Sequence, residues 1–271
     1  MVKRLLTASI LILVALAFFI LRQVHTVIFD CGVVLVCGLG LFEFMRAFKE
    51  DFTVFMMVIA ELTVLSMLPV FLFLGFLEVF YLLIGSFVII LISLVFDSKI
   101  TFKGITLYIF GLIYPLLLMF LFVVLNNTDY GLFFIVLAAI IPVFCDSLAL
   151  FVGMALKGPK LAPNVSPKKT ISGAIGGLFG GVLGAYLVLL LFTYAYPLDY
   201  IAVFKVWHVL LLGFVGSIFS ELGDLIESSI KRKLEIKDFS NVLPGHGGVL
   251  DRLDSLMFSA LIVFVFSFFF I

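Results

Sequence analysis

Residues 228–254 stand out in a chain that is 64% hydrophobic, because their side chains suit chemistry on phosphate groups. A cluster of cations opens the segment and would offset phosphate charge. A glycine-rich turn at 244–248 follows, where backbone N–H groups can approach an anion closely. Carboxylates at the end can hold a divalent metal that phosphates also bind. The charged residues are Lys231, Arg232, Lys233, Lys237, Asp238, Asp251, Arg252 and Asp254, and the turn contains His246, Gly247 and Gly248.

The apolar run before this segment carries a polar stripe. Its members follow one another in steps of three and four residues, which places them on one face of a helix. Ionised groups in an apolar run are expensive and usually functional. Such a stripe could also line the ion path of a transporter, but the glycine turn and the lysines favour phosphate. The stripe consists of Ser217, Ser220, Asp224, Ser228 and Lys231, and Glu221 and Glu227 flank it.

A second cationic loop, residues 157–170, ends directly before another apolar run. Ser166, Lys168, Lys169 and Thr170 would lie at a helix N-terminus, where free N–H groups and the helix dipole attract anions. An ordinary cytoplasmic loop, capped by Thr170 or Ser172, explains the same residues equally well. Further upstream, Asp146 lies inside an apolar run.

The elements that must position these residues are membrane helices. A mean hydropathy of +1.35 with 13% charged residues excludes a soluble domain. Because a span needs about 20 apolar residues, the sequence predicts an all-α, polytopic membrane protein of about nine transmembrane helices with a cytoplasm-facing polar site. We expect residues 1–125 to be transmembrane scaffold and residues 126–271 the transmembrane catalytic region. The expected spans are 5–21, 26–45, 53–74, 77–96, 104–125, 131–156, 171–196, 204–230 and 250–271.

Charge placement orients these spans. With a cytoplasmic N-terminus, all 17 Lys and Arg residues except Arg22 and Lys205 fall on the cytoplasmic side, as the positive-inside rule requires. The loops at 157–170 and 231–249 then face the cytoplasm, where nucleotides are found, and the C-terminus faces the periplasm. The net charge is zero and points to no partner, so no nucleic acid is expected.

Two features outside the polar segments concern packing. Glycines repeat every four residues on two faces of 171–196, which predicts close helix–helix contact. We expect no strand before this run and therefore no dinucleotide-binding fingerprint. In the first half, Glu43 lies three residues before Arg46, and we expect it to be a capping or paired residue rather than a catalyst. The glycines are Gly173, Gly177 and Gly181 on one face, and Gly176, Gly180 and Gly184 on the other.

Residues 228–254 resemble, without a gap, the signature of the phosphatidate cytidylyltransferases (CDP-diacylglycerol synthases). The resemblance extends to 145–177, where the family carries an Asp-Ser/Thr pair and an SPxKT loop before a glycine-rich helix. Leu150 departs from a common Tyr and Ser172 from a usual Glu, so no catalytic role is expected for Ser172. The matching residues are Ser228, Ile230, Lys231, Arg232, Lys237, Asp238, Pro244, His246, Gly247, Gly248, Asp251, Arg252 and Asp254.

The resemblance implies a nucleotidyltransferase of phospholipid synthesis in the bacterial inner membrane. It would join phosphatidic acid and CTP into CDP-diacylglycerol and pyrophosphate, by attack of the lipid phosphate on the CTP α-phosphorus. Mg²⁺, with room for a second metal ion, would be held by Asp224 and Asp251, assisted by Asp146 or Asp254. His246 would order the turn or bind phosphate. The resemblance further implies catalytic roles for Lys231 and Arg232, substrate contacts from Ser166, Lys168, Lys169, Thr170, Lys237, Asp238, Gly247, Gly248 and Arg252, and a homodimer as one option.

Three other functions share part of this pattern. A CTP-using enzyme acting on another lipid has the same apparatus and differs in its acceptor pocket. An ion-coupled transporter predicts inverted repeats, and the sequence shows none. An aspartyl intramembrane protease would account for Gly223-Asp224 but not for a lysine-rich loop beside the glycine turn.

Overall fold

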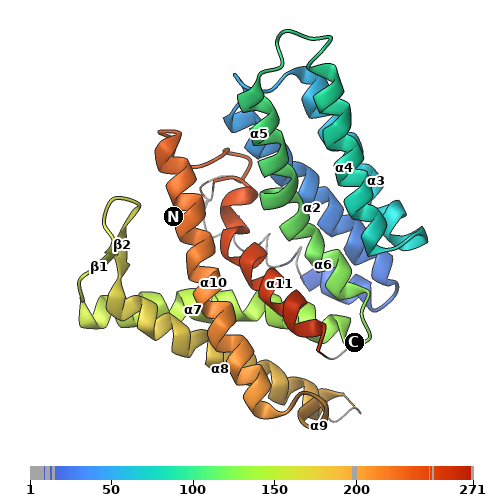
Figure 1. Ribbon diagram of the computed structural model, residues 1–271. Coiled ribbons are helices and arrows are strands. Elements are labelled where there is room, and N and C mark those ends of the chain that lie inside the picture. Colours follow the sequence, from blue (N-terminus) through green and yellow to red (C-terminus); the bar gives the residue numbers. More distant parts are fainter. Residues whose placement is uncertain are drawn as a thin grey trace. The chain divides into compact units, whose positions relative to one another are not determined.

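The computed structural model describes residues 9, 13, 16–196, 200–243, 245 and 247–269, and nearly all of its regular structure is helical (Figure 1). Seven helices in this part of the chain are long and apolar enough to cross a membrane. The chain is therefore a multi-pass membrane protein, as predicted. These helices are α2 (Thr26–Ala47), α3 (Val54–Phe73), α4 (Phe76–Ser93), the continuous helix Phe102–Asn126, α7 (Gly131–Leu156), α8 (Ile171–Ala195) and α10 (Val206–Lys233).

The expected count of nine spans is not confirmed. The first expected span, 5–21, lies largely outside the described residues. In place of the last, 250–271, the structure has the 3-10 turn η2 (Leu250–Arg252) and then α11 (Asp254–Ser267), which has only 14 residues. The seven expected spans from 26–45 to 204–230 each coincide with one long helix to within a few residues.

The chain divides into two compact units. The first consists of Met1–Val124 together with Asp238–Arg252, and the second of Leu125–Lys237 together with Leu253–Ile271. The glycine turn thus belongs to the same unit as the N-terminal helices. Whether the first half acts as scaffold and the second as catalyst stays a prediction.

In the first unit, hydroxyl side chains join neighbouring helices. Thr63 of α3 donates to Ser86 of α4 at 2.8 Å, and Ser86 is 2.5 Å from the hydroxyl of Tyr108. The helix that carries Tyr108 has three parts: α5 (Phe102–Gly111), the π-helical η1 (Leu112–Leu117) and α6 (Leu118–Asn126). Pro115 lies inside η1, in agreement with the rule that a proline breaks the regular helical ladder.

In the second unit, α8 packs on α7 and on α10 through its glycines, as predicted. A Cβ at Gly180 would collide with the Phe144 carbonyl of α7, and one at Gly181 would collide with the Ser217 hydroxyl of α10. The Gly176 face meets α7, while Gly177 and Gly181 meet α10. A side chain on either face would push two helices apart. The short helix α9 (Tyr200–Phe204) precedes α10.

A strand does precede α8, contrary to expectation. β1 (Lys160–Ala162) pairs antiparallel with β2 (Ser166–Thr170), with Lys160 opposite Thr170. This hairpin stands at one end of the α7–α8 pair (Figure 1). It arises because the chain leaves α7 at Lys157, whose φ of 46° ends the helix, and must return to begin α8. A two-stranded hairpin lacks the parallel sheet of a dinucleotide-binding fold.

Candidate active site

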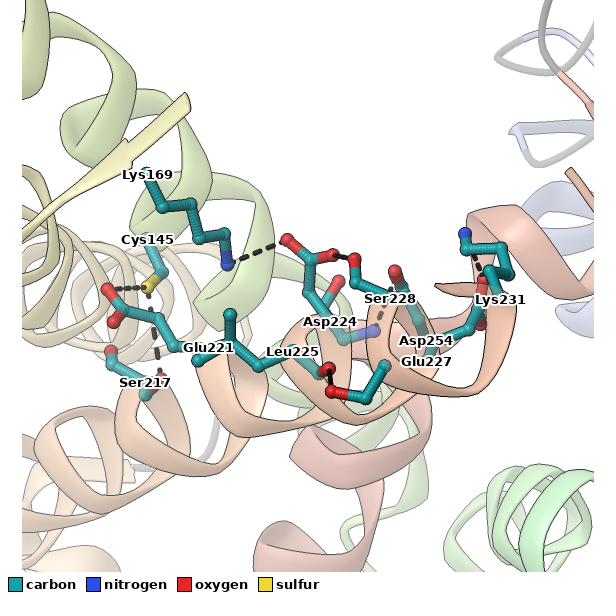
Figure 2. A network of polar contacts seen from close by, with 12 residues as sticks. Cys145, Lys169, Ser217, Glu221, Asp224, Leu225, Glu227, Ser228, Lys231 and Asp254 are labelled. Carbon is teal, nitrogen blue, oxygen red and sulfur yellow. Dashed lines mark hydrogen bonds and ion pairs between the residues drawn. The ribbon is translucent and has the colours of Figure 1, made fainter. Parts of the chain in front are cut away.

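An ion pair in the second unit joins the hairpin to the polar stripe of α10. The Lys169 ammonium, at the end of β2, lies 2.6 Å from Oδ2 of Asp224. The other carboxylate oxygen of Asp224 accepts a hydrogen bond from Ser228, one turn later, at 3.2 Å. Figure 2 shows the lysine reaching from the hairpin to this aspartate. The expected stripe is therefore present, and β2 supplies its cation.

Lys169 is surrounded by more negative charge than one partner supplies. Burial by itself lowers the pKa of its ammonium, but attraction by Asp224, then Asp146 and Glu221, outweighs burial and raises that pKa above its usual value. The lysine therefore stays a cation at neutral pH. Its position lets one positive charge attract carboxylates from both α7 and α10.

Asp254 begins α11 and adds another acid to this group. Its carboxylate interacts electrostatically with Asp224, Lys231 and Asp146, in that order of strength. The approach depends on Gly223, because a Cβ there would lie 2.6 Å from the backbone carbonyl of Asp254. The glycine directly before Asp224 is thus needed for packing, which the sequence analysis did not predict.

Lys231 and Arg232, two of the three cations in the last turn of α10, have different surroundings. Lys231 lies 2.8 Å from Oε1 of Glu227, one turn earlier, and that glutamate is fully buried. Arg232 is exposed, and its Nε donates to the Val165 carbonyl of the hairpin at 3.4 Å. Glu227, expected only to flank the stripe, therefore holds one of the predicted phosphate-binding side chains.

A pocket of about 520 Å³ opens beside the Lys169–Asp224 pair. Lys168, Lys169, Thr170 and Asp146, all predicted site residues, line it together. Thr170 also caps α8 by accepting a hydrogen bond from the Gly173 N–H. Predicted Ser166 is not among the lining residues. The full lining is Asp146, Ala149, Leu150, Gly153, Met154, Lys157, Gly158, Lys160, Leu161, Lys168, Lys169, Thr170, Gly173, Ala174 and Glu221.

The glycine turn of the first unit lies in a segment that we call the signature loop (Asp238–Arg252). Oδ2 of Asp251 accepts hydrogen bonds from the N–H groups of Phe239 (2.9 Å) and Gly248 (2.8 Å). Gly247 and Gly248 are buried, and Gly247 has a φ of 87°. The Gly248 N–H, expected to face an anion, is thus turned to the protein's own carboxylate.

Other predicted residues of the signature loop and its flank lie on the surface. Lys237, Asp238 and Arg252 are exposed. His246 lies outside the described residues. Asp251 and Asp224 belong to different units, so their sharing of one metal stays a prediction.

Glu43 of α2 contacts the signature loop, a contact that the sequence analysis did not predict. Its side chain is buried and accepts three hydrogen bonds, from the Ser240 hydroxyl and from the N–H groups of Val249 and Leu250. An acid inside an apolar run was the available signal, and it was interpreted as a cap or a pair with Arg46.

Comparison of the sequence with known proteins identifies a family. The sequence profile of the cytidylyltransferase family matches residues 2–270. The chain belongs to this family.

Curated relatives are phosphatidate cytidylyltransferases by name. The protein of Bacillus subtilis (strain 168) is 37% identical over 138 residues, which cover 51% of this chain and 48% of that protein. The protein of Brucella abortus biovar 1 is 38% identical over 122 residues, 45% of this chain and 42% of the relative. That of Staphylococcus haemolyticus is 54% identical over 54 residues, 20% and 21% of the two chains. The matches thus span about half or less of each relative.

Mg²⁺ binding by the acids of the second unit stays a prediction. Mg²⁺ prefers oxygen ligands and is commonly held by one or two carboxylates, with substrate phosphates and water completing the shell. Asp224, Asp146 and Asp254 influence one another electrostatically and supply such oxygens. Among the described residues, no group of three or more His, Cys, Asp or Glu side chains is placed so that it could hold a metal ion. A cation binding at Oδ2 of Asp224 would have to displace the ammonium of Lys169.

Proposed function

We propose that the protein is an integral-membrane phosphatidate cytidylyltransferase of a bacterial cell membrane. It would join phosphatidic acid and CTP to give CDP-diacylglycerol and pyrophosphate. The observation that carries this proposal is the lysine-ringed pocket beside the Lys169–Asp224 pair, in a chain of the cytidylyltransferase family. The names of the curated relatives support it.

The reaction needs positioning and charge neutralisation more than a protein nucleophile. An oxygen of the lipid phosphate forms a bond to the α-phosphorus of CTP, and the bond from that phosphorus to the β-phosphate oxygen breaks. The electron pair leaves with pyrophosphate. Because both reactants are anions, cations that hold them in line should supply most of the rate. Lys168 and Lys169 are the cations that the pocket offers on β2.

The lining of the pocket favours the lipid phosphate over the cytidine. Leu150, Met154 and Leu161 give it an apolar wall, and Lys157 and Lys160 stand near that wall. None of the described lining residues is aromatic or carries an amide side chain, so the pocket offers no ring for base stacking and no side-chain amide for a base edge. A phosphate with attached acyl methylenes matches both the charge and the apolar wall.

Asp224, with Asp146 and Asp254, would hold Mg²⁺ in this proposal. Bound there with the substrate phosphates, the ion would stabilise the negative charge that develops on the transferred and leaving groups. Lys169 holds Asp224 in place before a substrate arrives and can turn to a phosphate once its partner has another cation. Lys231, held by Glu227, keeps a positive charge on the same helix end.

Position-specific labels test this proposal. The purified protein in detergent, with Mg²⁺ and phosphatidic acid, should transfer label from α-³²P CTP into the organic phase. Label from γ-³²P CTP should stay in water as pyrophosphate. Diacylglycerol, which lacks the phosphate, should accept neither.

The reverse distribution, with the γ-label in the lipid, would identify a lipid kinase instead. Transfer of the α-label to a different phospholipid in preference to phosphatidic acid would keep the chemistry and reject the acceptor. No transfer of either label would reject the activity.

A further inference from the structure

Glu43 makes the contacts by which α2 holds the signature loop. Oε1 of this buried carboxylate is 2.5 Å from the Ser240 hydroxyl and 3.0 Å from the Val249 N–H, and Oε2 is 2.9 Å from the Leu250 N–H. The side chain is 3% exposed. These three hydrogen bonds all come from the signature loop, which lies about 200 residues after Glu43 in the sequence.

Two carboxylates fasten the loop at adjacent points. Asp251 joins Phe239 to Gly248. Glu43 joins Ser240 to Val249 and Leu250. Three successive N–H groups, those of residues 248–250, thus point to the protein's own acids. Successive N–H groups of this kind form an anion site, and here carboxylates fill it.

This arrangement changes what the loop can offer a substrate. With these N–H groups committed, what the loop presents at the surface includes the side chains at its two ends, Asp238 and Arg252. The two carboxylate bridges hold the sides of the loop together, and among its described residues the Leu243 N–H also donates to the Gly247 carbonyl at 2.9 Å. A buried carboxylate with three hydrogen bonds is well suited to fixing a glycine-rich loop, which is otherwise entropically costly to order.

We propose that Glu43 is a positioning residue for the reaction and acts by holding the signature loop in its reactive conformation. This inference rests on the proposed function. Glu43 does not touch substrate. It fixes the loop from which Arg252 acts on phosphate groups, so that part of the expected scaffold takes part in catalysis.

The substitution Glu43→Gln tests this role, because it keeps the shape of the side chain and replaces one acceptor oxygen with an N–H donor. Hydrogen exchange of the loop amides should accelerate at least about tenfold, since their protection depends on these bonds. The kcat of the folded enzyme should fall about tenfold or more, while the KM for phosphatidic acid stays within about twofold. Glu78→Gln, the same change on α4, is the matched control and should alter neither.

Gly248 provides a second variant. A Cβ at Gly248 would collide with the Glu43 carboxylate, so Gly248→Ala should reduce kcat in the native background. In a Glu43→Ala background the collision is absent, and Gly248→Ala should cost little more, a non-additivity expected of residues in contact.

The exchange and the kinetics give separate answers. Native exchange rates in Glu43→Gln would overturn the proposal, and so would faster exchange with an undiminished kcat. If the native protein transferred no label, the proposed function would fail by itself. The exchange measurement would still decide whether Glu43 holds the loop.

Discussion

Lys169 illustrates how one side chain can organise an acidic site. Asp146 of α7 and Glu221 and Asp224 of α10 all act on it, and its ammonium is closest to Asp224. Without that cation, the acids would repel one another across the contact between the two helices. Lys168, the preceding residue, lines the same pocket but is exposed.

Lys169→Met and Lys168→Met should therefore differ in effect. We expect Lys169→Met to lower kcat by roughly a hundredfold, because a partly buried carboxylate loses its partner, equivalent to ~2.7 kcal/mol of transition-state stabilisation. Lys168→Met should raise the KM for phosphatidic acid by less than about fivefold, since other lysines surround the pocket. Steady-state kinetics with both substrates varied will measure this. Equal effects of the two changes would contradict a special role for Lys169.

The residues of the site were predictable where they lie close together in sequence. The spacing of Asp224 and Ser228 gave their shared face, and their hydrogen bond confirms it. Glu43 was not predictable, because its partner Leu250 is 207 positions away and no periodicity links such distant residues. The two N–H groups of the loop that one oxygen of Asp251 accepts were not predicted either, and the role of Asp251 in metal binding stays a prediction.

At the scale of elements, α8 is the helix whose sequence most directly predicts its packing. Small residues on two faces predicted two close neighbours, which are α7 and α10, although Gly173 meets α7 while Gly181 on the same predicted face meets α10. The hairpin before α8 was missed because the spacing of its short strands gives no apolar alternation. The expected span 250–271 was wrong at its start, because the 3-10 turn η2 (Leu250–Arg252) precedes α11.

Gly181→Ala should destabilise the protein, because its methyl group would meet the Ser217 hydroxyl and the Gly213 carbonyl. Overpacking of this kind typically costs about 1–3 kcal/mol. Gly85→Ala in α4 is the matched control, because open space surrounds that position. It should be neutral or stabilise the helix by up to about 1 kcal/mol. Thermal unfolding in detergent, followed by far-UV circular dichroism, will compare them, and a loss of stability at Gly85 alone would refute the packing argument.

At the scale of the whole molecule, the distribution of cations predicts an orientation. In the second unit, Arg232 contacts Val165, so the hairpin and the end of α10 lie at the same end of the helices. The hairpin and the last turn of α10 are both rich in basic residues. The positive-inside rule therefore predicts that this end faces the cytoplasm.

Reporter fusions can test the orientation. Fusions at Pro163 and Phe239 should be active with a cytoplasmic reporter, and a fusion at Asp129 only with a reporter that needs export. The predicted cytoplasmic N-terminus follows from the same alternation of spans. Export of the Pro163 fusion, or a common side for Pro163 and Asp129, would reject this topology.

The length of α10 determines the depth at which its acids meet the bilayer. From Val206 to Gly223 the helix rises about 27 Å, at 1.5 Å per residue, which nearly matches a hydrocarbon layer of about 30 Å. The ten residues from Asp224 to Lys233 then extend beyond the acyl chains, into the layer where lipid headgroups lie. A phospholipid diffusing in the leaflet would bring its phosphate to the level of Asp224 without leaving the membrane. A water-soluble nucleotide would reach the same depth from the adjacent aqueous phase.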